Sequence, residues 1–401
     1  MNIGIIKEGK KIPDKRTAFS PQQCSEIMSK YPFVRFYVQP SPIRCFKDAE
    51  YADKGCMLQE DLTHCDIIFG IKEVPIPALI SDKTFLFFSH TIKQQPYNRN
   101  LLQTILEKNI SLIDYETLKN SEGERIVAFG RYAGLVGAYN GILTYGKKYN
   151  LFDLQPAYLL FDRKEKDIEL AKVKLPALKI ALTGNGRVTK GAIEMLEAMK
   201  IRRVSVTEYL QNDFEEAVYT QLRSADYHKN SDGKIFDNDF YSNPSNYESD
   251  FQKFYQQTDI LIATAYWNPK APLLFTKEET QRHDFKIKVI ADITCDINGS
   301  IPTTVQASTI AEPFYDFNPQ TLHVAPPFSN SQNITVMAVD NLPCEMPRDA
   351  SIDFGNDLIN RVLPSLLVAD TEQIIENALV TKQGYLTQNF SYLEEYVLQK
   401  V

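Results

Sequence analysis

The first 120 residues alternate short apolar runs with amphipathic segments. The apolar runs predict strands at 3–6, 33–38, 66–69, 84–88 and 110–113, with helices at 21–31, 46–54 and 97–108 between them. Ser20 and Pro21 mark one helix start, because serine caps the first turn and proline suits its first position. This alternation predicts a parallel sheet that helices cover on both faces.

A second series of strands begins at a glycine turn. An apolar run at 178–182 enters Gly184-Asn185-Gly186, a helix pattern follows, and a strand-like run at 203–207 ends at Glu208. Glycines let the backbone approach a pyrophosphate, the helix N-terminus offers N–H groups, and a carboxylate accepts ribose hydroxyls. The segment therefore indicates a dinucleotide site. An ordinary βα turn is the alternative, because Thr189 stands where the full fingerprint has a third glycine.

The remaining pattern completes two domains. A long helix is predicted at 131–149, an irregular charged stretch at 151–175, strands at 260–263, 288–291 and 335–339, and tail helices at 352–363, 371–379 and 392–400. We expect an α/β protein with two doubly wound Rossmann-like domains, parallel sheets and an active-site cleft between the domains. Residues 1–134 and 345–401 would form the substrate and catalytic domain. Residues 135–344 would bind the dinucleotide, with a polar insertion at 228–257 as a surface excursion.

Composition narrows the function classes. The 401 residues suit two or three domains, and the net charge of −7 argues against a nucleic-acid partner. No apolar run approaches the roughly 18 residues of a membrane span, and the N-terminus lacks an apolar signal region, so we expect a cytoplasmic protein without a membrane partner. The six cysteines show no CxxC spacing, so no metal site is expected. Monomer and homo-oligomer both remain open.

Charged side chains follow several strands of the first domain. Lys72 and Glu73, His90 and Lys93, Arg16, and Glu116 come after four predicted strands. Carboxyl ends of parallel strands share one edge, where a desolvated lysine near other cations titrates closer to neutral pH. The alternatives are charged residues returning to solvent and a structural histidine at position 90. In the second domain, 292–296 and 339–343 also end strands, with turn and cap chemistry as the alternative.

Several longer strings together resemble the lysine–oxoglutarate reductase and saccharopine dehydrogenase family, which is related to alanine dehydrogenase and the transhydrogenase α-subunit. The match covers nearly the whole chain in order. The matching strings are IGIIKEGKKIPDKRTAFSP, FFSHTIKQQ, LLQTILEKNISLIDYE, RIVAFGRYAGLVG, TGNGRVTKGA, ADITCDINGSI and AVDNLPCEMPRDAS. The resemblance implies a reversible oxidoreduction in which saccharopine, NAD(P)+ and water give lysine, 2-oxoglutarate and NAD(P)H. A related amino-acid dehydrogenase or an opine-type reductase, acting on alanine or an ornithine-derived substrate, is the alternative.

The resemblance also implies roles for individual residues. Lys72 and His90 would be the catalytic acid–base pair. Substrate would contact Arg16, Lys93, Glu73, Glu116 and Asp296, with Glu73 and Glu116 tuning the catalytic cations. Positions that would line the cofactor are Gln95, Arg125, Gly184, Gly186, Arg187, Val188, Glu208, Tyr266, Ile293, Val339, Asp340, Asn341 and Leu342.

Two features bear on specificity. Glu208 would repel a 2′-phosphate and so favours NAD, while Arg187, Arg202 and Arg203 would offset it and allow NADP. Residues 151–175 lack the histidine-containing stretch of related reductases, and this difference bears on the identity of the amino-acid substrate.

Overall fold

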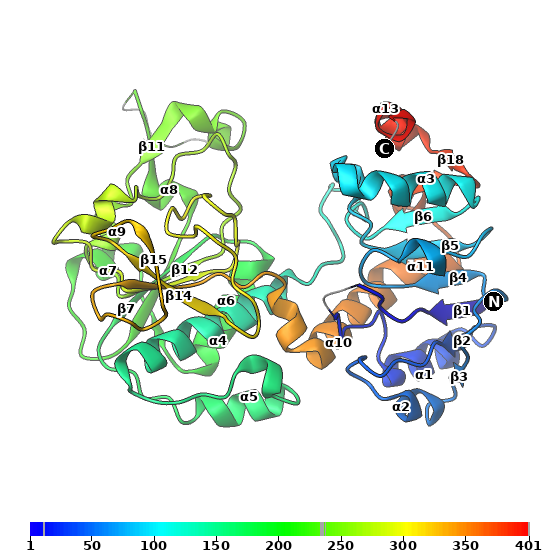
Figure 1. Cartoon of the computed structure of the whole chain (residues 1–401), viewed down its shortest axis with the longest axis horizontal. Coiled ribbons are helices and arrows are strands. Elements are labelled where there is room, and N and C mark those ends of the chain that lie inside the picture. The colour runs from blue at the N-terminus through cyan, green and yellow to red at the C-terminus, as the bar shows by residue number, and fades with distance from the viewer. Residues whose placement is uncertain (11–12, 233–235, 237, 400–401) are drawn as a thin grey trace. The chain divides into compact units, whose positions relative to one another are not determined.

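The computed structural model describes residues 1–10, 13–232, 236 and 238–399. Its internal contacts divide the chain into two units: unit 1 comprises residues 1–129 and 347–401, and unit 2 comprises residues 130–346. Each unit has an eight-stranded, mostly parallel sheet with helices packed around it (Figure 1). The predicted α/β class is therefore confirmed.

The sheet of unit 1 has the order β3-β2-β1-β4-β5-β6-β17-β18. The first six strands are parallel, and β17 and β18 complete the edge in antiparallel orientation. The strand order reverses between β1 and β4, which makes this the topological switch point. The strands are β1 (Asn2–Ile5), β2 (Arg35–Val38), β3 (Met57–Leu58), β4 (Ile67–Phe69), β5 (Thr84–Phe87), β6 (Ser111–Asp114), β17 (Leu379–Lys382) and β18 (Tyr385–Leu386).

Helices cover this sheet, and apolar strands form its core. Phe85, Leu86 and Phe87 of β5 are fully buried, as expected for a central parallel strand. Ser20 and Gln23 form a capping box at the start of the first helix, as the sequence predicts. The helices of unit 1 are α1 (Pro21–Lys30), α2 (Asp48–Ala52), α3 (Arg99–Glu107), α10 (Pro347–Asp357), α11 (Leu363–Leu367), α12 (Ile374–Ala378) and α13 (Glu394–Leu398), with a π-helical turn at Leu358–Val362 and 3₁₀ turns at Ile76–Ala78, Thr91–Lys93, Pro96–Asn98 and Gln388–Leu393.

The C-terminal tail is not entirely helical. Where the sequence predicts helices at 371–379 and 392–400, the structure has the short helices α12 and α13 with the β17–β18 hairpin between them. The hydroxyl of Thr381 bridges to β6 by accepting from Leu112 N–H and donating to the carbonyl of Ile110. Gly384 supplies the hairpin's positive φ of 81°. Pairing with a distant strand therefore adds a hairpin between the two predicted helices, where the local pattern predicts no strand. Residue 400 lies outside the described residues.

The sheet of unit 2 has the order β15-β14-β16-β13-β12-β7-β9-β8, with its switch point between β7 and β12. Among the described pairs of this sheet, β14 is antiparallel to both of its neighbours, β16 and β15, and the other neighbouring strands are parallel. The strands are β7 (Lys179–Thr183), β8 (Arg202–Arg203), β9 (Val218–Leu222), β12 (Ile260–Ala263), β13 (Val289–Asp292), β14 (Phe314–Asn318), β15 (His323–Ala325) and β16 (Ile334–Met337). A separate pair is β10 (His228–Asn230) and β11 (Tyr247–Ser249).

The helices of unit 2 include one in a segment that the sequence analysis takes as irregular. Residues 151–175 contain a helix from Arg163 to Leu170, which Asp162 caps by accepting from the N–H groups of Lys164 and Glu165. The helices are α4 (Gly130–Tyr149), α5 (Arg163–Leu170), α6 (Arg187–Ala198), α7 (Val206–Gln211), α8 (Ser224–Tyr227) and α9 (Gln252–Tyr255), with 3₁₀ turns at Ala157–Leu159, Asn238–Tyr241, Pro244–Asn246, Glu278–Gln281 and Leu342–Glu345.

One further prediction in unit 2 is wrong. The predicted strand at 203–207 ends at Arg203, because Ser205 and Glu208 form a capping box that starts helix α7. The insertion at 228–257 is folded in its described part, which pairs β10 with β11 and buries Phe240, Tyr247 and Phe251; its place as a surface excursion stays a prediction.

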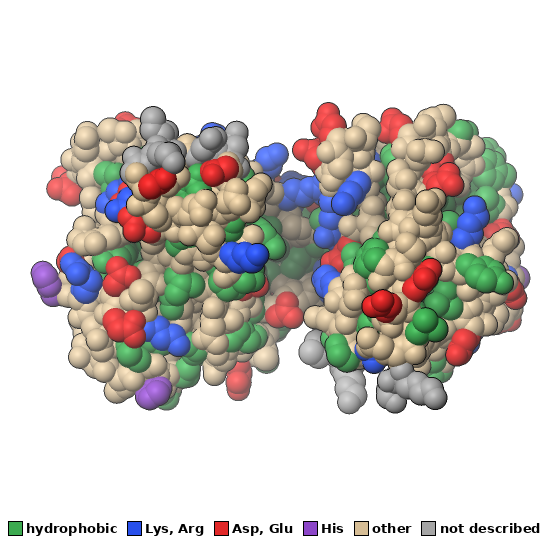
Figure 2. All heavy atoms as spheres, turned by 90° about the horizontal axis from the view of Figure 1, so that it is seen from above, with side chains coloured by type: hydrophobic (Ala, Val, Ile, Leu, Met, Phe, Trp, Pro, Cys, Tyr) green, Lys and Arg blue, Asp and Glu red, His purple; other side chains and the backbone are tan. Residues whose placement is uncertain are grey.

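The outer surface carries mixed charge. Acidic and basic side chains are interspersed on the visible face of each unit (Figure 2), in keeping with a modest net charge of −7. Within the described parts of the chain, no helix combines the length and apolar character needed to cross a membrane.

Helices α4 and α6 approach each other closely at two glycines. A Cβ on Gly134 would lie 1.8 Å from the carbonyl oxygen of Val188, and a Cβ on Gly191 would lie 1.8 Å from that of Arg131. Gly191 therefore supplies the close packing that a third fingerprint glycine at position 189 would otherwise provide. Thr189 instead forms a 2.7 Å hydroxyl hydrogen bond with Thr264.

We expect Gly191→Ala to lower the free energy of unfolding by at least about 2 kcal/mol, because the added methyl group collides with backbone that cannot turn away. The matched control is Gly186→Ala, where a Cβ meets no atom within 4 Å. Chemical denaturation of both variants measures the difference. Equal stabilities would show that the two helices move apart at little cost.

Glu345 makes the stability of unit 2 dependent on pH. It is 2 % exposed and accepts a 2.9 Å hydrogen bond from Asn140 Nδ2. Burial raises the pKa of Glu345 to about 7, although the Asn140 hydrogen bond opposes this shift. From pH 4.5 to 7 the folded chain therefore holds a proton that the unfolded chain has released, so stability falls as pH rises through this range.

We expect the stability of the wild type relative to Glu345→Gln to decrease by about 2–3 kcal/mol between pH 5 and pH 8, because glutamine does not titrate. Denaturation of both proteins at the two pH values isolates this contribution. A constant difference between the proteins would mean that Glu345 is already ionised at pH 5.

Candidate functional site

The switch point of unit 1 joins the loops that follow β1 and β4. The Glu8 carboxylate accepts from the N–H groups of Ile71 and Lys72, at 2.7 and 2.9 Å. Burial raises the pKa of Glu8 to about 7, and the charge of Asp14 adds to the rise. Glu8 thus holds the start of the Lys72 loop. The sequence analysis missed it, although Glu8 follows a strand just as the predicted residues do.

Lys72 and His90 both lie in this part of unit 1. Burial lowers the pKa of the Lys72 amine, and the positive charge of Arg16 lowers it further. His90 Nδ1 and Glu73 Oε1 form a 2.6 Å hydrogen bond. Burial alone would raise the pKa of Glu73, but hydrogen bonds from His90 and Lys10 outweigh it and bring this pKa to about 2. Glu73 therefore acts on both predicted catalytic residues, on His90 through a hydrogen bond and on Lys72 through its charge.

The backbone of His90 is in an uncommon conformation. Its φ of 54° lies in the left-handed region, which residues other than glycine seldom adopt. The preceding Ser89 donates from its N–H and its hydroxyl to buried Asp114, which fixes the turn after β5. Strained residues of this kind are concentrated at functional sites, where surrounding structure maintains them.

Three cations near this pair are held by carboxylates or aromatic rings. Arg16 pairs with Asp14 at 2.6 Å and lies 4.1 Å from the ring centre of Phe129. Lys93 pairs with Glu116 at 3.1 Å, and Arg125 lies 4.0 Å from the same carboxylate. The partners of Glu116 are thus Lys93 and Arg125, and the carboxylate that contacts His90 is Glu73. We call Glu8, Arg16, Lys72, Glu73, His90, Lys93, Glu116 and Arg125 the charged strand-end cluster.

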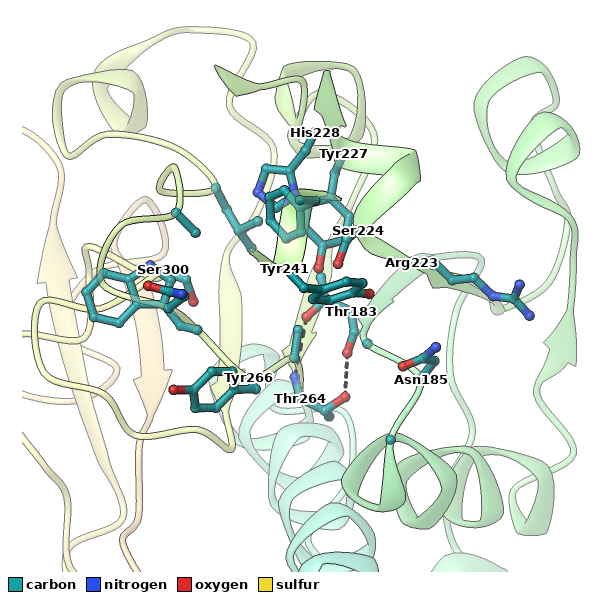
Figure 3. A pocket seen from close by; sticks show the side chains of 18 of the residues that line it. Thr183, Asn185, Arg223, Ser224, Tyr227, His228, Tyr241, Thr264, Tyr266 and Ser300 are labelled. Atoms are coloured by element: carbon teal, nitrogen blue, oxygen red, sulfur yellow. Dashed lines mark hydrogen bonds between the residues drawn. The ribbon is translucent and has the colours of Figure 1, made fainter. Parts of the chain in front are cut away.

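The switch point of unit 2 has a different character. Gly184 has a φ of 107°, and Gly186 is the N-terminal cap residue of α6. A hollow of about 340 Å³ opens beside this turn. Thr183 accepts through its carbonyl from the Thr264 hydroxyl, which ties the ends of β7 and β12 together (Figure 3). Of the predicted cofactor residues, those in the lining are Gly184, Gly186, Arg187, Val188 and Tyr266.

The other predicted cofactor residues lie elsewhere. Gln95 and Arg125 belong to unit 1. Ile293 follows β13, and Val339 to Leu342 follow β16, so they lie at the carboxyl ends of two strands further along the sheet, where the predicted substrate residue Asp296 also follows β13. Asn341 has a φ of 64°, and its Nδ2 donates to Cys344 Sγ. Their contact with a nicotinamide ring stays a prediction.

Glu208 is not in the described lining of the hollow. Its carboxylate accepts from the N–H and hydroxyl of Ser205, at 2.9 and 2.7 Å, and caps α7. The strand beside β7 is β9 rather than β8, and β9 ends at Leu222. The residue in the usual position for a ribose contact is therefore Arg223, which lines the hollow. The sequence analysis missed Arg223 because strand order is not visible in a single sequence.

The glycine turn fits a dinucleotide on its own geometry. The space above Gly186 is open, so a phosphate can approach its backbone closely. The first N–H groups of the 12-residue helix α6 point to the same place, where they can bind an anion. Gly184, Gly186, Arg187 and Val188 would hold the pyrophosphate.

Family models match both parts of the chain. The model "Alanine dehydrogenase/PNT, N-terminal domain" matches residues 4–136, and "Alanine dehydrogenase/PNT, C-terminal domain" matches residues 161–389. Among solved structures, an L-alanine dehydrogenase superposes with a TM-score of 0.63 at 15% identity, covering 99% of each chain. A transhydrogenase from Sinorhizobium meliloti gives 0.62 at 14% identity, covering 96% of this chain and 100% of that one. The predicted fold is thus found in solved structures.

The curated relatives include alpha-aminoadipic semialdehyde synthases and saccharopine dehydrogenases. A mitochondrial alpha-aminoadipic semialdehyde synthase of Mus musculus is 31% identical, over 95% of this chain and 46% of the relative. The chain thus spans less than half the length of that relative. A saccharopine dehydrogenase [NAD(+), L-lysine-forming] of Neurospora crassa is 25% identical over 96% of both chains. These matches confirm the predicted relationship, and the chain belongs to the alanine dehydrogenase/PNT family of NAD(P)-dependent dehydrogenases.

Proposed function

We propose that this protein interconverts saccharopine, NAD(P)+ and water with lysine, 2-oxoglutarate and NAD(P)H. The observation that carries the proposal is the charged strand-end cluster of unit 1, in which Glu73 forms a hydrogen bond with His90 and its charge acts on Lys72. The relatives named saccharopine dehydrogenase support the choice of substrate. The cofactor, when bound, takes or gives the hydride at the carbon beside the secondary amine.

Lys72 is the proposed base for that amine. Burial and the neighbouring charge of Arg16 lower the pKa of Lys72, so this amine loses its proton more readily than a lysine in water, as a proton acceptor requires. His90 is the proposed group that moves a proton when water adds to the imine carbon. The Glu73 hydrogen bond orients the His90 ring for this step.

The remaining members of the cluster suit the charges of the substrate. Saccharopine has three carboxylates, and Arg16, Lys93 and Arg125 offer cations that neighbouring groups already hold in place. The second oxygen of Glu116, Oε2, is buried and has no hydrogen-bond partner in the described structure. A buried acceptor of this kind is costly unless a donor arrives, and the ammonium group of the substrate can provide it.

The choice between NAD and NADP depends on the residues near β9. A second hollow beside the ends of β8 and β9 is lined by Arg203 and Arg223, together with Ser205 and Asp226. Arg202 pairs with Glu216 at 3.2 Å, whereas among the described residues no carboxylate forms an ion pair with Arg203 or Arg223. Two cations without a carboxylate partner favour a 2′-phosphate, so we propose NADP as the preferred cofactor in place of the NAD expected from Glu208.

Initial rates of NADPH and NADH oxidation test the proposed function. Lysine with 2-oxoglutarate should give saturable oxidation that needs both substrates. A panel of alanine-type and ornithine-type reactions, pyruvate with ammonia and ornithine with 2-oxo acids, covers the alternative dehydrogenases and reductases. Turnover of that panel alone would exclude a saccharopine reaction. So would the absence of turnover with both NADPH and NADH.

We expect Lys72→Met to reduce kcat by more than about a hundredfold with little change in cofactor affinity, because it removes a proton acceptor from unit 1 and leaves the glycine turn of unit 2 intact. Lys83→Met is the matched control, as Lys83 precedes β5 at the opposite end of the strands. Steady-state rates and cofactor titration separate the two effects. A parallel loss of cofactor binding would contradict a proton-transfer role.

We expect Arg223→Gln to reduce kcat/KM for NADPH at least about tenfold more than for NADH, because a charge-assisted bond to phosphate contributes about 1.5–3 kcal/mol. Glu208→Ala is the comparison variant and should change the ratio of the two kcat/KM values by less than about twofold. The reverse outcome, with the ratio sensitive to Glu208 and insensitive to Arg223, would return the ribose contact to Glu208.

A further inference from the structure

The described part of the insertion at 228–257 is folded around an aromatic core. Phe240 stacks on His228 with ring centres 4.6 Å apart and meets Tyr247 edge-on at 5.2 Å. Burial lowers the pKa of His228 to about 4, so its ring is uncharged at neutral pH and packs with the others. The N–H of Asp250 donates to the carbonyl of Tyr227 and the hydroxyl of Ser249 to that of Leu274, which fastens the segment to unit 2.

Tyr241 stands apart from this core. Its neighbour Phe240 is 7 % exposed, but Tyr241 is 65 % exposed although it contacts Phe240 at 5.5 Å between ring centres. Tyr241 lines the hollow beside the glycine turn, and Figure 3 shows its ring lying across the hollow above Thr183 and Thr264. The aromatic core of the insertion thus presents an exposed aromatic ring to a cavity, an arrangement that leaves apolar surface uncovered unless a ligand packs on it.

Two more aromatic side chains line the same hollow. Tyr266 follows β12 and is 90 % exposed. Trp267 has a buried indole N–H without a hydrogen-bond partner in the described structure. Asn185, Ser224 and Ser300 contribute polar groups to the same lining. Aromatic faces with a few polar groups between them suit a flat heterocycle with hydrogen-bonding edges.

The order of groups around the hollow indicates which part of a ligand reaches Tyr241. Phosphates belong at the N-terminus of α6, beside Gly186, and a ribose belongs at the end of β9, beside Arg223. Ser224 and Tyr227, which follow Arg223 in the chain, line the same hollow as Tyr241 of the insertion (Figure 3). A ligand held first by phosphate and then by ribose therefore places its base against the insertion.

We propose that the insertion is part of the dinucleotide site and that Tyr241 provides the surface on which the adenine ring stacks. The inference rests on the dinucleotide of the proposed function, but it is independent of the amino-acid substrate. In this proposal, the described part of the 228–257 segment forms the side of the site that contacts adenine.

Titration of the full-length chain with ADP tests this role. Trp267 is the single tryptophan of the chain and lines the hollow, so its fluorescence reports binding there. We expect Tyr241→Ala to weaken ADP binding about tenfold or more, in line with base stacking on an aromatic side chain. Tyr241→Phe keeps the ring and should remain within about twofold of the wild type. Tyr385→Ala is the control, since Tyr385 is 78 % exposed on β18 of unit 1.

The outcomes separate this inference from the proposed reaction. An ADP affinity of Tyr241→Ala equal to that of the wild type, or no saturable ADP binding by the wild type, would overturn the role of Tyr241. A loss of ADP affinity in Tyr241→Ala that Tyr241→Phe restores would support it, even if lysine and 2-oxoglutarate gave no turnover. That absence of turnover would contradict the proposed reaction alone.

Discussion

The structure depends on one constraint of parallel sheets: at a switch point, the chain leaves two neighbouring strands toward opposite faces, and their carboxyl ends stay uncovered. Both units have such a point, between β1 and β4 in unit 1 and between β7 and β12 in unit 2. Helices and apolar strands bury the rest of each sheet, so polar chemistry is confined to this edge. The charged strand-end cluster lies at this edge in unit 1, and the hollow beside Gly186 lies at this edge in unit 2.

The two edges differ because their local sequences differ. In unit 1, the carboxylates of Glu8, Asp14, Glu73 and Glu116 hold loops and cations in place, and burial shifts the pKa of Lys72 and of Glu8. In unit 2, the turn after β7 contains glycines where unit 1 has charged side chains, so the backbone N–H groups of the turn form the binding surface. One edge is therefore suited to proton transfer, and the other to binding phosphate.

Local patterns predict most of the fold. Apolar runs identify the central strands, Ser20-Pro21 marks the start of α1, and the glycine turn identifies the entry to α6. The convergence of Lys72, Glu73 and His90 also follows from the rule that parallel strands end at one edge. Glu8 follows from the same rule, applied once more to the first strand.

Features that depend on distant pairing are not predictable in this way. The β17–β18 hairpin forms because Thr381 bonds to β6, almost 270 residues away in the chain. The position of Arg223 depends on β9 lying beside β7, and the role of the insertion depends on how its aromatic core packs. The error at 203–207 has a different cause, because it does not depend on distant pairing. Ser205 and Glu208 have the spacing of a capping box, which predicts a helix start rather than a strand end.

The central claim is that hydride passes between the dinucleotide and the carbon beside the secondary amine of saccharopine. Reduced cofactor deuterated at both C4 positions, supplied with lysine and 2-oxoglutarate, tests this claim most directly. Mass spectrometry of the amine product should show one deuterium, on the carbon derived from the keto group of 2-oxoglutarate. Cofactor oxidation that yields no deuterated saccharopine would contradict the account.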